Sequence, residues 1–266
     1  MTHGWQLHWR VFTIPKWGNA PDENEDAAYP LTVNCPIKLG KGESFSCALS
    51  DGATQSSFSR LWANILADEA SRASIFISDP MRILEHAIPR WKNQVSRYEL
   101  PWHAEEKVRR GAFATLVWLG IKIIEGRPRG MQGSWKALVL GDSCLFQLRE
   151  GVLISSAPEP PGPDFSLNPV LFSSIAERNQ QLLNRISSQI TSGDCRSGDQ
   201  FILVSDALAE WIFKNYNSGC EPFKMMQTRV FDAPANRSSF AAWVNSLREE
   251  KSIKNDDTTL ASVMLE

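Results

Sequence analysis

The sequence predicts an α+β fold, in which strands joined by hairpins form the sheets and the helices are separate from them. Three observations support this class. Apolar residues alternate with polar ones in several short segments, as in half-buried strands. In several longer segments they recur at helical spacing. Where strands follow one another, a turn such as Glu150-Gly151 joins them instead of a crossover helix, which favours α+β over a doubly wound parallel sheet.

The first part of the chain predicts two strands and a helix. Residues 7–11 and residues 45–49 alternate apolar and more polar side chains, so each segment is expected to be a strand. From Ser56 to Ala70 the apolar residues lie at helical spacing. Ser56 or Ser57 is the expected cap of that helix, because a serine hydroxyl accepts a hydrogen bond from the first turn.

The middle of the chain predicts a second helix and then a meander of strands. Residues Pro80 to Tyr98 are expected to be helical, with a proline early, where its missing N–H costs nothing. Pro89 predicts a kink or a break in that helix. Ala112 to Ile124 and Trp135 to Leu148 are expected to be mainly strands, and Gly151 to Ser155 continues the meander.

The C-terminal part of the chain predicts one stiff loop and a further mixture of helices and strands. Residues 157–163 (Ala-Pro-Glu-Pro-Pro-Gly-Pro) are expected to be a surface loop and not a domain linker, because strand patterns resume beyond them. The remaining predicted elements are a helix over Ser174 to Ile190, a strand over Gln200 to Ser205, helices over Leu208 to Tyr216 and Ser238 to Glu250, and a strand over Thr258 to Leu265. We therefore expect residues 1–266 to form a single domain.

Composition indicates a globular enzyme of the cytoplasm. A chain of 266 residues can bury about three quarters of its unfolded surface. Its 28 basic and 30 acidic residues nearly balance, so nucleic acid is not an expected partner. The longest apolar run, Leu116 to Ile124, is too short to span a bilayer, and no signal peptide is visible. Five cysteines without a Cys-x-x-Cys pair indicate reduced thiols, with Cys47 and Cys144 in the core.

Six short acidic motifs at the ends of apolar runs are the main functional signal. In chain order they are Asn24-Glu25-Asp26, Ser50-Asp51-Gly52, Gly141-Asp142-Ser143, Gly198-Asp199, Ser205-Asp206 and Asn255-Asp256-Asp257. Each alone has an ordinary explanation, because Asp beside Gly, Ser or Asn is common in turns. Together, carboxylates delivered by distant strand ends can converge, and such oxygen ligands suit Mg²⁺ or Mn²⁺. Two such ions are suited to the attack of water on phosphorus.

Taken in order, these motifs and their flanking strands resemble those of the protein phosphatase 2C family, the metal-dependent Ser/Thr phosphatases. The similarity extends from about Asn24 to Leu265. It includes the segments Asn24 to Ala27, Phe45 to Gly52, Gly111 to Thr115, Ala137 to Ser143, Gly198 to Asp206 and Asp256 to Leu260. The resemblance implies a four-layer α-β-β-α sandwich with two antiparallel sheets packed face to face, an architecture that periodicity alone does not predict.

The resemblance also implies a site for two Mn²⁺ or Mg²⁺ ions, which activate a bridging water as the nucleophile. Asp51 would bridge both ions. The carbonyl of Gly52 would bind one of them, since a residue without a side chain lets the backbone approach closely. Asp206 and Asp257 would complete the other position.

Two further acidic motifs have roles implied by the same resemblance. Glu25 and Asp26 would act on water molecules of the metals, so Asp26 and Asp51 are the expected catalytic residues. Asp142 matches the position that holds a third, weaker metal in some members of the family.

Other roles stay open for several of these carboxylates. Asp206 directly precedes a predicted helix and can be its N-cap. Asp142 and Asp257 can be turn residues, and Asp256 competes with Asp257 for the ligand role. Asp199 follows a glycine at the start of a strand and is interpreted as a turn residue.

The sequence departs from the family at positions that bind substrate. Ala207 follows the late Ser-Asp pair, where the family usually has Gly. Ala53 stands where animal members carry a His that is a candidate general acid, and Pro21 where they carry a phosphate-binding Arg. The motifs are more similar to those of a divergent, mostly bacterial branch.

The leading functional hypothesis is a phosphatase of phosphoserine and phosphothreonine in proteins, opposing a Ser/Thr kinase. A second hypothesis is a catalytically silent module with the phosphatase fold, which regulates or scaffolds, because fold does not determine function. A third is a phosphatase of small phosphoesters. No membrane partner is expected, and the sequence predicts no oligomeric state.

Overall fold

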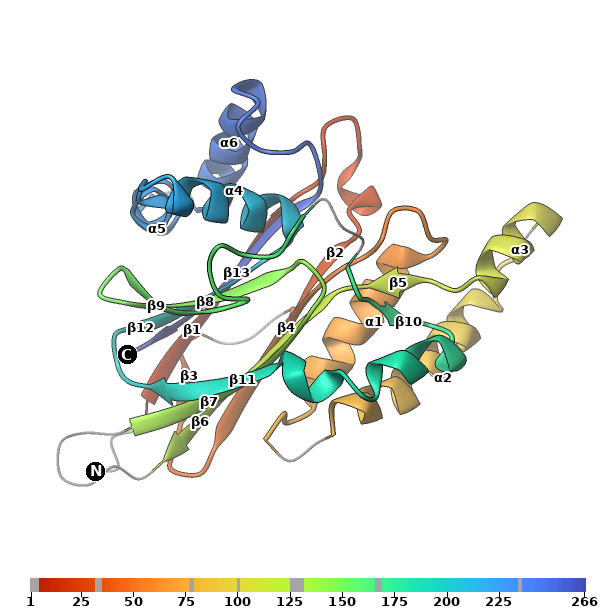
Figure 1. Cartoon of the computed structure of the whole chain (residues 1–266), viewed down its shortest axis with the longest axis horizontal. Coiled ribbons are helices and arrows are strands. Elements are labelled where there is room, and N and C mark those ends of the chain that lie inside the picture. The colour runs from red at the N-terminus through yellow and green to blue at the C-terminus, as the bar shows by residue number, and fades with distance from the viewer. Residues whose placement is uncertain are drawn as a thin grey trace.

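The protein is a sandwich of four layers in which two antiparallel sheets face each other and helices cover both outer faces (Figure 1). The computed structural model describes residues 5–31, 35–76, 79–99, 101–124, 132–165, 169–233 and 236–266. The order of the layers is two helices, a five-stranded sheet, a six-stranded sheet and a second group of helices. This arrangement confirms both the predicted α+β class and the α-β-β-α sandwich.

Every neighbouring pair of strands in the two large sheets is antiparallel. The six-stranded sheet has the order β3 (Ile37–Leu39), β1 (Trp5–Ile14), β13 (Thr258–Leu265), β12 (Asp199–Val204), β8 (Cys144–Arg149) and β9 (Val152–Ala157). The five-stranded sheet has the order β11 (Ile190–Cys195), β7 (Gln132–Leu140), β6 (Leu116–Ile124), β4 (Ser44–Asp51) and β2 (Asp26–Tyr29). A short ribbon pairs β5 (Phe113–Ala114) with β10 (Phe172–Ser173).

The helices fall into two groups that cover opposite faces of the sandwich. The α-helices are α1 (Ser59–Arg72), α2 (Ile83–Val95), α3 (Trp102–Arg109), α4 (Asp206–Asn217), α5 (Pro222–Met226) and α6 (Asn236–Glu249). The 3₁₀ turns are Pro21–Glu23, Pro80–Arg82, Ala176–Leu182 and Ile186–Gln189, and a π-helical turn spans Gln227–Phe231. None of the helices that the model describes is long and apolar enough to cross a membrane.

Three apolar layers hold these elements together. Leu49, Val117 and Leu203 belong to the layer between the two sheets. Trp118 packs in the layer shared with α1 and α2, and Phe146 in the layer shared with α4, α5 and α6. Because the central strands are buried on both faces, β6 and β12 are almost continuously apolar instead of alternating. Cys47 and Cys144 are buried in these layers, as predicted.

Two helix predictions need correction. The helix expected from residue 56 begins at Ser59, after Phe58, whose φ of 61° is left-handed. Ser56 does not cap it, because its hydroxyl donates to the carbonyl of Ala53 and accepts from the N–H of Phe113. Residues 174–190 form two 3₁₀ turns instead of one α-helix. The Asn179 amide there bonds the backbone of Ser173, in competition with helical hydrogen bonds.

Some elements lie outside the predictions or differ from them in detail. Pro89 is an exposed residue within α2 and does not break that helix. The strands β2 and β11 and the helices α3 and α5 have no counterpart among the predicted elements. The strand β2 is the most important of these for function, since it begins at Asp26.

Candidate active site

Carboxylates from five separate segments meet at one end of the sandwich. Asp26, the first residue of β2, is directly opposite Asp51, the last residue of β4. Asp206 follows β12, and Asp256 precedes β13, whose start pairs with the end of β12. Asp142 lies in the turn between β7 and β8. The antiparallel pairing therefore delivers acidic residues that are far apart in sequence to one place.

A cavity of about 720 Å³ opens at this place. Four of the carboxylates, those of Asp51, Asp142, Asp206 and Asp256, form one part of its wall. Four cationic side chains, Lys107, Arg110, Arg178 and Lys254, also line it. The Arg178 guanidinium lies over the Phe113 ring, 5.7 Å from its centroid, and Arg110 forms an ion pair of 2.6 Å with Glu106. The cavity thus offers both acidic and basic groups to a ligand.

Thr115 fixes the position of Asp51. Its hydroxyl accepts a hydrogen bond of 2.9 Å from the Asp51 N–H, and its own N–H donates to the Asp51 carbonyl at 2.9 Å. The same hydroxyl bonds the Ser143 hydroxyl at 2.8 Å, which ties β4 to the turn that carries Asp142. Gly141 in that turn has a φ of +103°, and a Cβ there would lie 2.6 Å from Thr115. A glycine is needed at this point both for its backbone conformation and for the close approach.

The Asp26 carboxyl group is buried without a hydrogen-bond partner on either oxygen. Its pKa is raised from 3.8 to about 8, mainly by burial and also by the neighbouring Asp257 and Asp206 charges. The hydroxyls of Thr259 and Ser205 approach the carboxyl group and offset part of this rise. Because a buried polar group normally has a partner, Asp26 is a group that either a proton or a cation would stabilise.

The pKa values of the other clustered carboxylates are also raised. For Asp51 the cause is burial first, and then the charges of Asp26 and Asp206. Burial and the charge of Asp206 raise the pKa of Asp142 to about 6. Burial raises the pKa of Asp206, although Lys254 opposes the rise. Like charges in a buried site repel one another, so this cluster favours bound cations.

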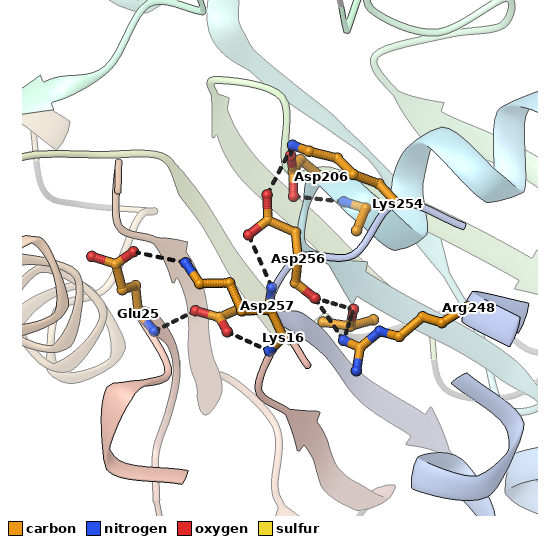
Figure 2. A network of polar contacts seen from close by, with 9 residues as sticks. Lys16, Glu25, Asp206, Arg248, Lys254, Asp256 and Asp257 are labelled. Atoms are coloured by element: carbon orange, nitrogen blue, oxygen red, sulfur yellow. Dashed lines mark hydrogen bonds and ion pairs between the residues drawn. The ribbon is translucent and has the colours of Figure 1, made fainter. Parts of the chain in front are cut away.

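The structure separates the roles of Asp256 and Asp257. Asp256 lines the cavity, whereas Asp257 is buried and its two oxygens accept hydrogen bonds from the Lys16 and Glu25 N–H groups at 2.8 and 2.7 Å. Asp257 therefore joins the start of β13 to the segments before and after the first 3₁₀ turn. Figure 2 shows these two contacts, and it shows Asp256 directed towards Lys254.

Gly52, whose carbonyl was predicted to bind a metal, lines the cavity, and Glu25, which was predicted to act on metal-bound water, contacts residues beside it. The Glu25 carboxylate accepts a hydrogen bond from the Ser59 hydroxyl and lies 3.8 Å from the Lys16 ammonium. A Cβ on Gly52 would lie 2.8 Å from the Ser59 backbone. The glycine is therefore required by the start of α1, and its N–H donates to the Glu25 carbonyl at 3.2 Å.

The chemistry of the donors fits hard divalent cations. In the part of the chain that the model describes, no three His, Cys, Asp or Glu side chains stand in positions that ligate one ion together. The oxygen-rich set nevertheless suits Mg²⁺ or Mn²⁺, and the unpaired Asp26 oxygens are free to accept a ligand bond. Ligation therefore requires some of these side chains to rotate, and Lys254, which contacts two of them, to move.

Comparison with solved structures supports one fold assignment. The serine/threonine phosphatase Stp1 of Staphylococcus aureus is 12% identical, with 98% of this chain and 95% of that chain covered and a TM-score of 0.57. The S. agalactiae serine/threonine phosphatase is 14% identical, with coverage of 97% and 100% and a TM-score of 0.53. The catalytic domain of the serine/threonine protein phosphatase PstP, in complex with two manganese ions, is 14% identical, with coverage of 98% and 99% and a TM-score of 0.50.

The chain has the fold of these Ser/Thr phosphatases. The match covers the chain almost from end to end, so the fold implied by the acidic motifs is confirmed. Searches of protein-family models and of curated proteins returned no match to the sequence. This chain thus shares with these structures the arrangement of the sandwich. The roles of its site residues follow from their own contacts.

The structure adds residues to the site that sequence reasoning does not identify. Lys254, two positions before Asp256, reaches into the carboxylate cluster. Thr115 belongs to the segment Gly111 to Thr115, which resembles the family, but its hydrogen bonds to the Asp51 backbone were not predicted. Lys107 and Arg110 are at the end of a helix that was not predicted, so no pattern placed them at the cavity. Among the described residues that line the cavity there is no histidine.

Proposed function

We propose that the chain is a metal-dependent phosphatase of phosphoserine and phosphothreonine in proteins. The observation that carries the proposal is one cavity that is lined both by clustered carboxylates and by Lys107, Arg110 and Arg178. A phosphoprotein phosphatase needs both: acidic groups for the cations and basic groups for the phosphate. In this proposal residues 1–266 are one catalytic domain that acts in the cytoplasm against a Ser/Thr kinase.

Each carboxylate has a defined part in this proposal. Asp26, Asp51 and Asp206 would hold two Mn²⁺ or Mg²⁺ ions, with Asp51 shared by both, and Asp142 would be available to a third. Asp256 replaces Asp257 as the ligand from the last motif, because Asp257 already accepts two backbone hydrogen bonds. Bound divalent cations would supply Lewis acidity towards the phosphate and would make water in the cavity more acidic.

The chain's own residues orient the substrate. Arg110 and Arg178 can bind phosphate oxygens through their planar guanidinium groups, and Lys107 adds a third positive charge. In this proposal these residues serve instead of the phosphate-binding arginine that animal members of the family carry at the position of Pro21. Ala53 also lines the cavity, and a methyl group cannot donate a proton to the leaving alkoxide. Water would protonate the leaving group in this enzyme.

The experiment is hydrolysis of a phosphopeptide panel and of an aryl phosphate, with metal binding measured on the same protein. We expect turnover with Mn²⁺ or Mg²⁺ and loss of turnover in a chelator. Full turnover in excess EDTA would rule out the metal-dependent mechanism. Hydrolysis of small phosphoesters alone, with no phosphopeptide turnover at matched metal occupancy, would indicate a phosphatase of small molecules instead.

A second candidate function is a catalytically silent module with this fold. The observation that favours it is the Lys254 ammonium, which forms ion pairs with Asp206 and Asp256 at 3.0 and 2.9 Å. An internal cation of this kind can satisfy the carboxylates without metal. No turnover of any phosphoester, together with no binding of Mn²⁺, would support this alternative.

A further inference from the structure

We propose that Lys254 is an internal counter-ion that competes with a divalent cation for Asp206 and Asp256. This inference rests on the proposed function, because it concerns the same carboxylates. Its consequence is that the chain has two unequal metal positions: a tighter one next to Asp26 and Asp51, and a weaker one that a cation occupies only by displacing Lys254.

The contacts of Lys254 support this role. Its ammonium lies 3.0 Å from Asp206 Oδ2 and 2.9 Å from Asp256 Oδ2, so one charge bridges the carboxylate at the start of α4 and the carboxylate in the loop before β13 (Figure 2). Both acidic side chains are mostly buried, with 16% and 26% of their surface exposed. Hydrogen bonds between charged groups are stronger than neutral ones. A cation must therefore replace two charge-assisted contacts before it binds there.

The surrounding structure keeps Lys254 within reach of the two carboxylates. Arg248 is buried and donates to the Asp256 carbonyl at 2.6 Å and to the Pro15 carbonyl at 3.0 Å. The backbone of the segment 254–256 is thus held by α6, while the Lys254 side chain remains 52% exposed. The lysine can leave the carboxylates for solvent without disturbing the backbone, which is what reversible displacement requires.

The other half of the cluster has no such cation. Both Asp26 oxygens lack a hydrogen-bond partner, and no described lysine or arginine forms an ion pair with Asp51. Lys16 lies 3.8 Å from Glu25, which is a neighbour of this half and does not line the cavity. The difference in pairing between the two halves is the basis of the predicted difference in affinity.

The test is titration of the chelator-treated full chain with Mn²⁺ by calorimetry at constant pH. Lys254→Met removes the charge and keeps a long side chain. We expect it to raise the affinity of the weaker position roughly tenfold, because the cation no longer has to displace two charge-assisted contacts. The half-exposed ammonium is partly screened, which keeps the effect from being larger. Without metal the variant should melt at a lower temperature than the wild type. Its stabilisation by Mn²⁺ should be larger, as linkage requires.

Two controls make the result specific. Lys214→Met makes the same change of charge eight residues along α4 from Asp206, about 12 Å away by helical rise, and should leave the affinity unchanged. In an Asp206→Asn background, Lys254→Met should gain less, because one of its two partners is already neutral. Lys254→Gln serves as a second variant if the methionine protein folds poorly.

The outcomes separate this inference from the proposed function. Equal affinities in wild type and Lys254→Met, with phosphatase activity present, would overturn the inference and leave the function standing. Binding of Mn²⁺ to the variant but not to the wild type would support the inference in its strongest form and would contradict a metal-dependent wild-type enzyme. No binding to either protein would overturn both.

Discussion

The carboxylate cluster has two halves, Asp26 with Asp51 and Asp206 with Asp256, which differ in how their like charges are compensated. Asp26 and Asp51 face each other across β2 and β4, where burial raises the pKa of both. Asp206 is the first residue of α4 and Asp256 lies in the loop before β13, and Lys254 pairs with both. The first half depends on a proton or an external cation, whereas the second carries a cation of its own. In the proposed metal site, Lys254 would therefore oppose a cation in the second half only.

The location of each half explains the difference. The Asp26 and Asp51 backbones are paired across two strands, so the ladder holds the two residues opposite each other and only rotation of their side chains can change the distance between the carboxylates. Asp256 lies before the first residue of β13, in a segment with space for a long side chain to approach. Among the described residues, no basic side chain pairs with Asp51 to relieve its repulsion from Asp26. In the other half, Lys254 relieves the repulsion between Asp206 and Asp256.

The largest expected effect is that of a neutral residue at the centre of the rigid half. Asp51→Asn should lower metal-dependent hydrolysis by at least about 100-fold, since even outer-shell partners of metals are worth 10–100-fold. It should also abolish most of the Mn²⁺-induced rise in melting temperature. An unchanged rise would show that Asp51 does not ligate metal. Asp194→Asn, on the exposed strand β11, is the matched control and should have no effect.

The next comparison separates the neighbours Asp256 and Asp257. Asp257→Ala should lower the free energy of unfolding by about 2 kcal/mol, because two backbone N–H groups, those of Lys16 and Glu25, lose their acceptor. Asp256→Ala should instead weaken Mn²⁺ binding with little loss of stability in chelator. Denaturant titration and calorimetry measure the two quantities. The opposite pattern would indicate that Asp257, and not Asp256, is the metal ligand.

The third prediction concerns pH and the buried Asp26. Its pKa is raised from 3.8 to about 8 in the folded chain, so the folded state binds more protons than the unfolded state between these values. The stabilisation is therefore present below pH 4 and is lost as the pH rises to 8. In chelator, stability should fall by up to about 1.4 kcal/mol per pH unit for each such proton.

The comparison for this prediction is Asp26→Asn, which carries no titrating proton. The slope of stability against pH, measured by denaturant titration in chelator, should become shallower in this variant. Saturating Mn²⁺ should flatten the wild-type slope as well, because a cation replaces the proton. A steep slope that persists in Asp26→Asn would place the titration elsewhere in the cluster.

The smallest expected effect concerns the leaving group. A serine alkoxide leaves poorly unless it is protonated, whereas an aryl phosphate does not need an acid. Ala53→His should therefore raise kcat for a phosphopeptide by roughly several-fold, and that for an aryl phosphate less. Ala53→Gln controls for size. Equal changes in both rates would show that the acid is supplied from elsewhere.

Much of the fold could be predicted because it depends on local pattern and on motif order. The strands at 45–49 and 258–265 and the helix at 208–216 all appear in the structure. The elements that escaped prediction have weak local signals. β2 spans four residues, Asp26–Tyr29, and its pairing with β4 is what makes it a strand. The 3₁₀ turns at 176–189 depend on the Asn179 side chain, a contact that no periodicity encodes.

The same division applies to the site. The acidic motifs, through their order and the family resemblance that it carries, predicted Asp26, Asp51, Asp142 and Asp206 as candidate site residues, because carboxylates at strand ends are a short-range signal. Only the tertiary structure distinguishes Asp256, which lines the cavity, from Asp257, which accepts two backbone hydrogen bonds, and only it placed Lys254 between two carboxylates. Both decisions depend on which backbone N–H groups and which charges approach from distant segments. Which groups approach one another is set by the antiparallel register and by the layers of the sandwich. Neither can be predicted from residues that are neighbours in the sequence.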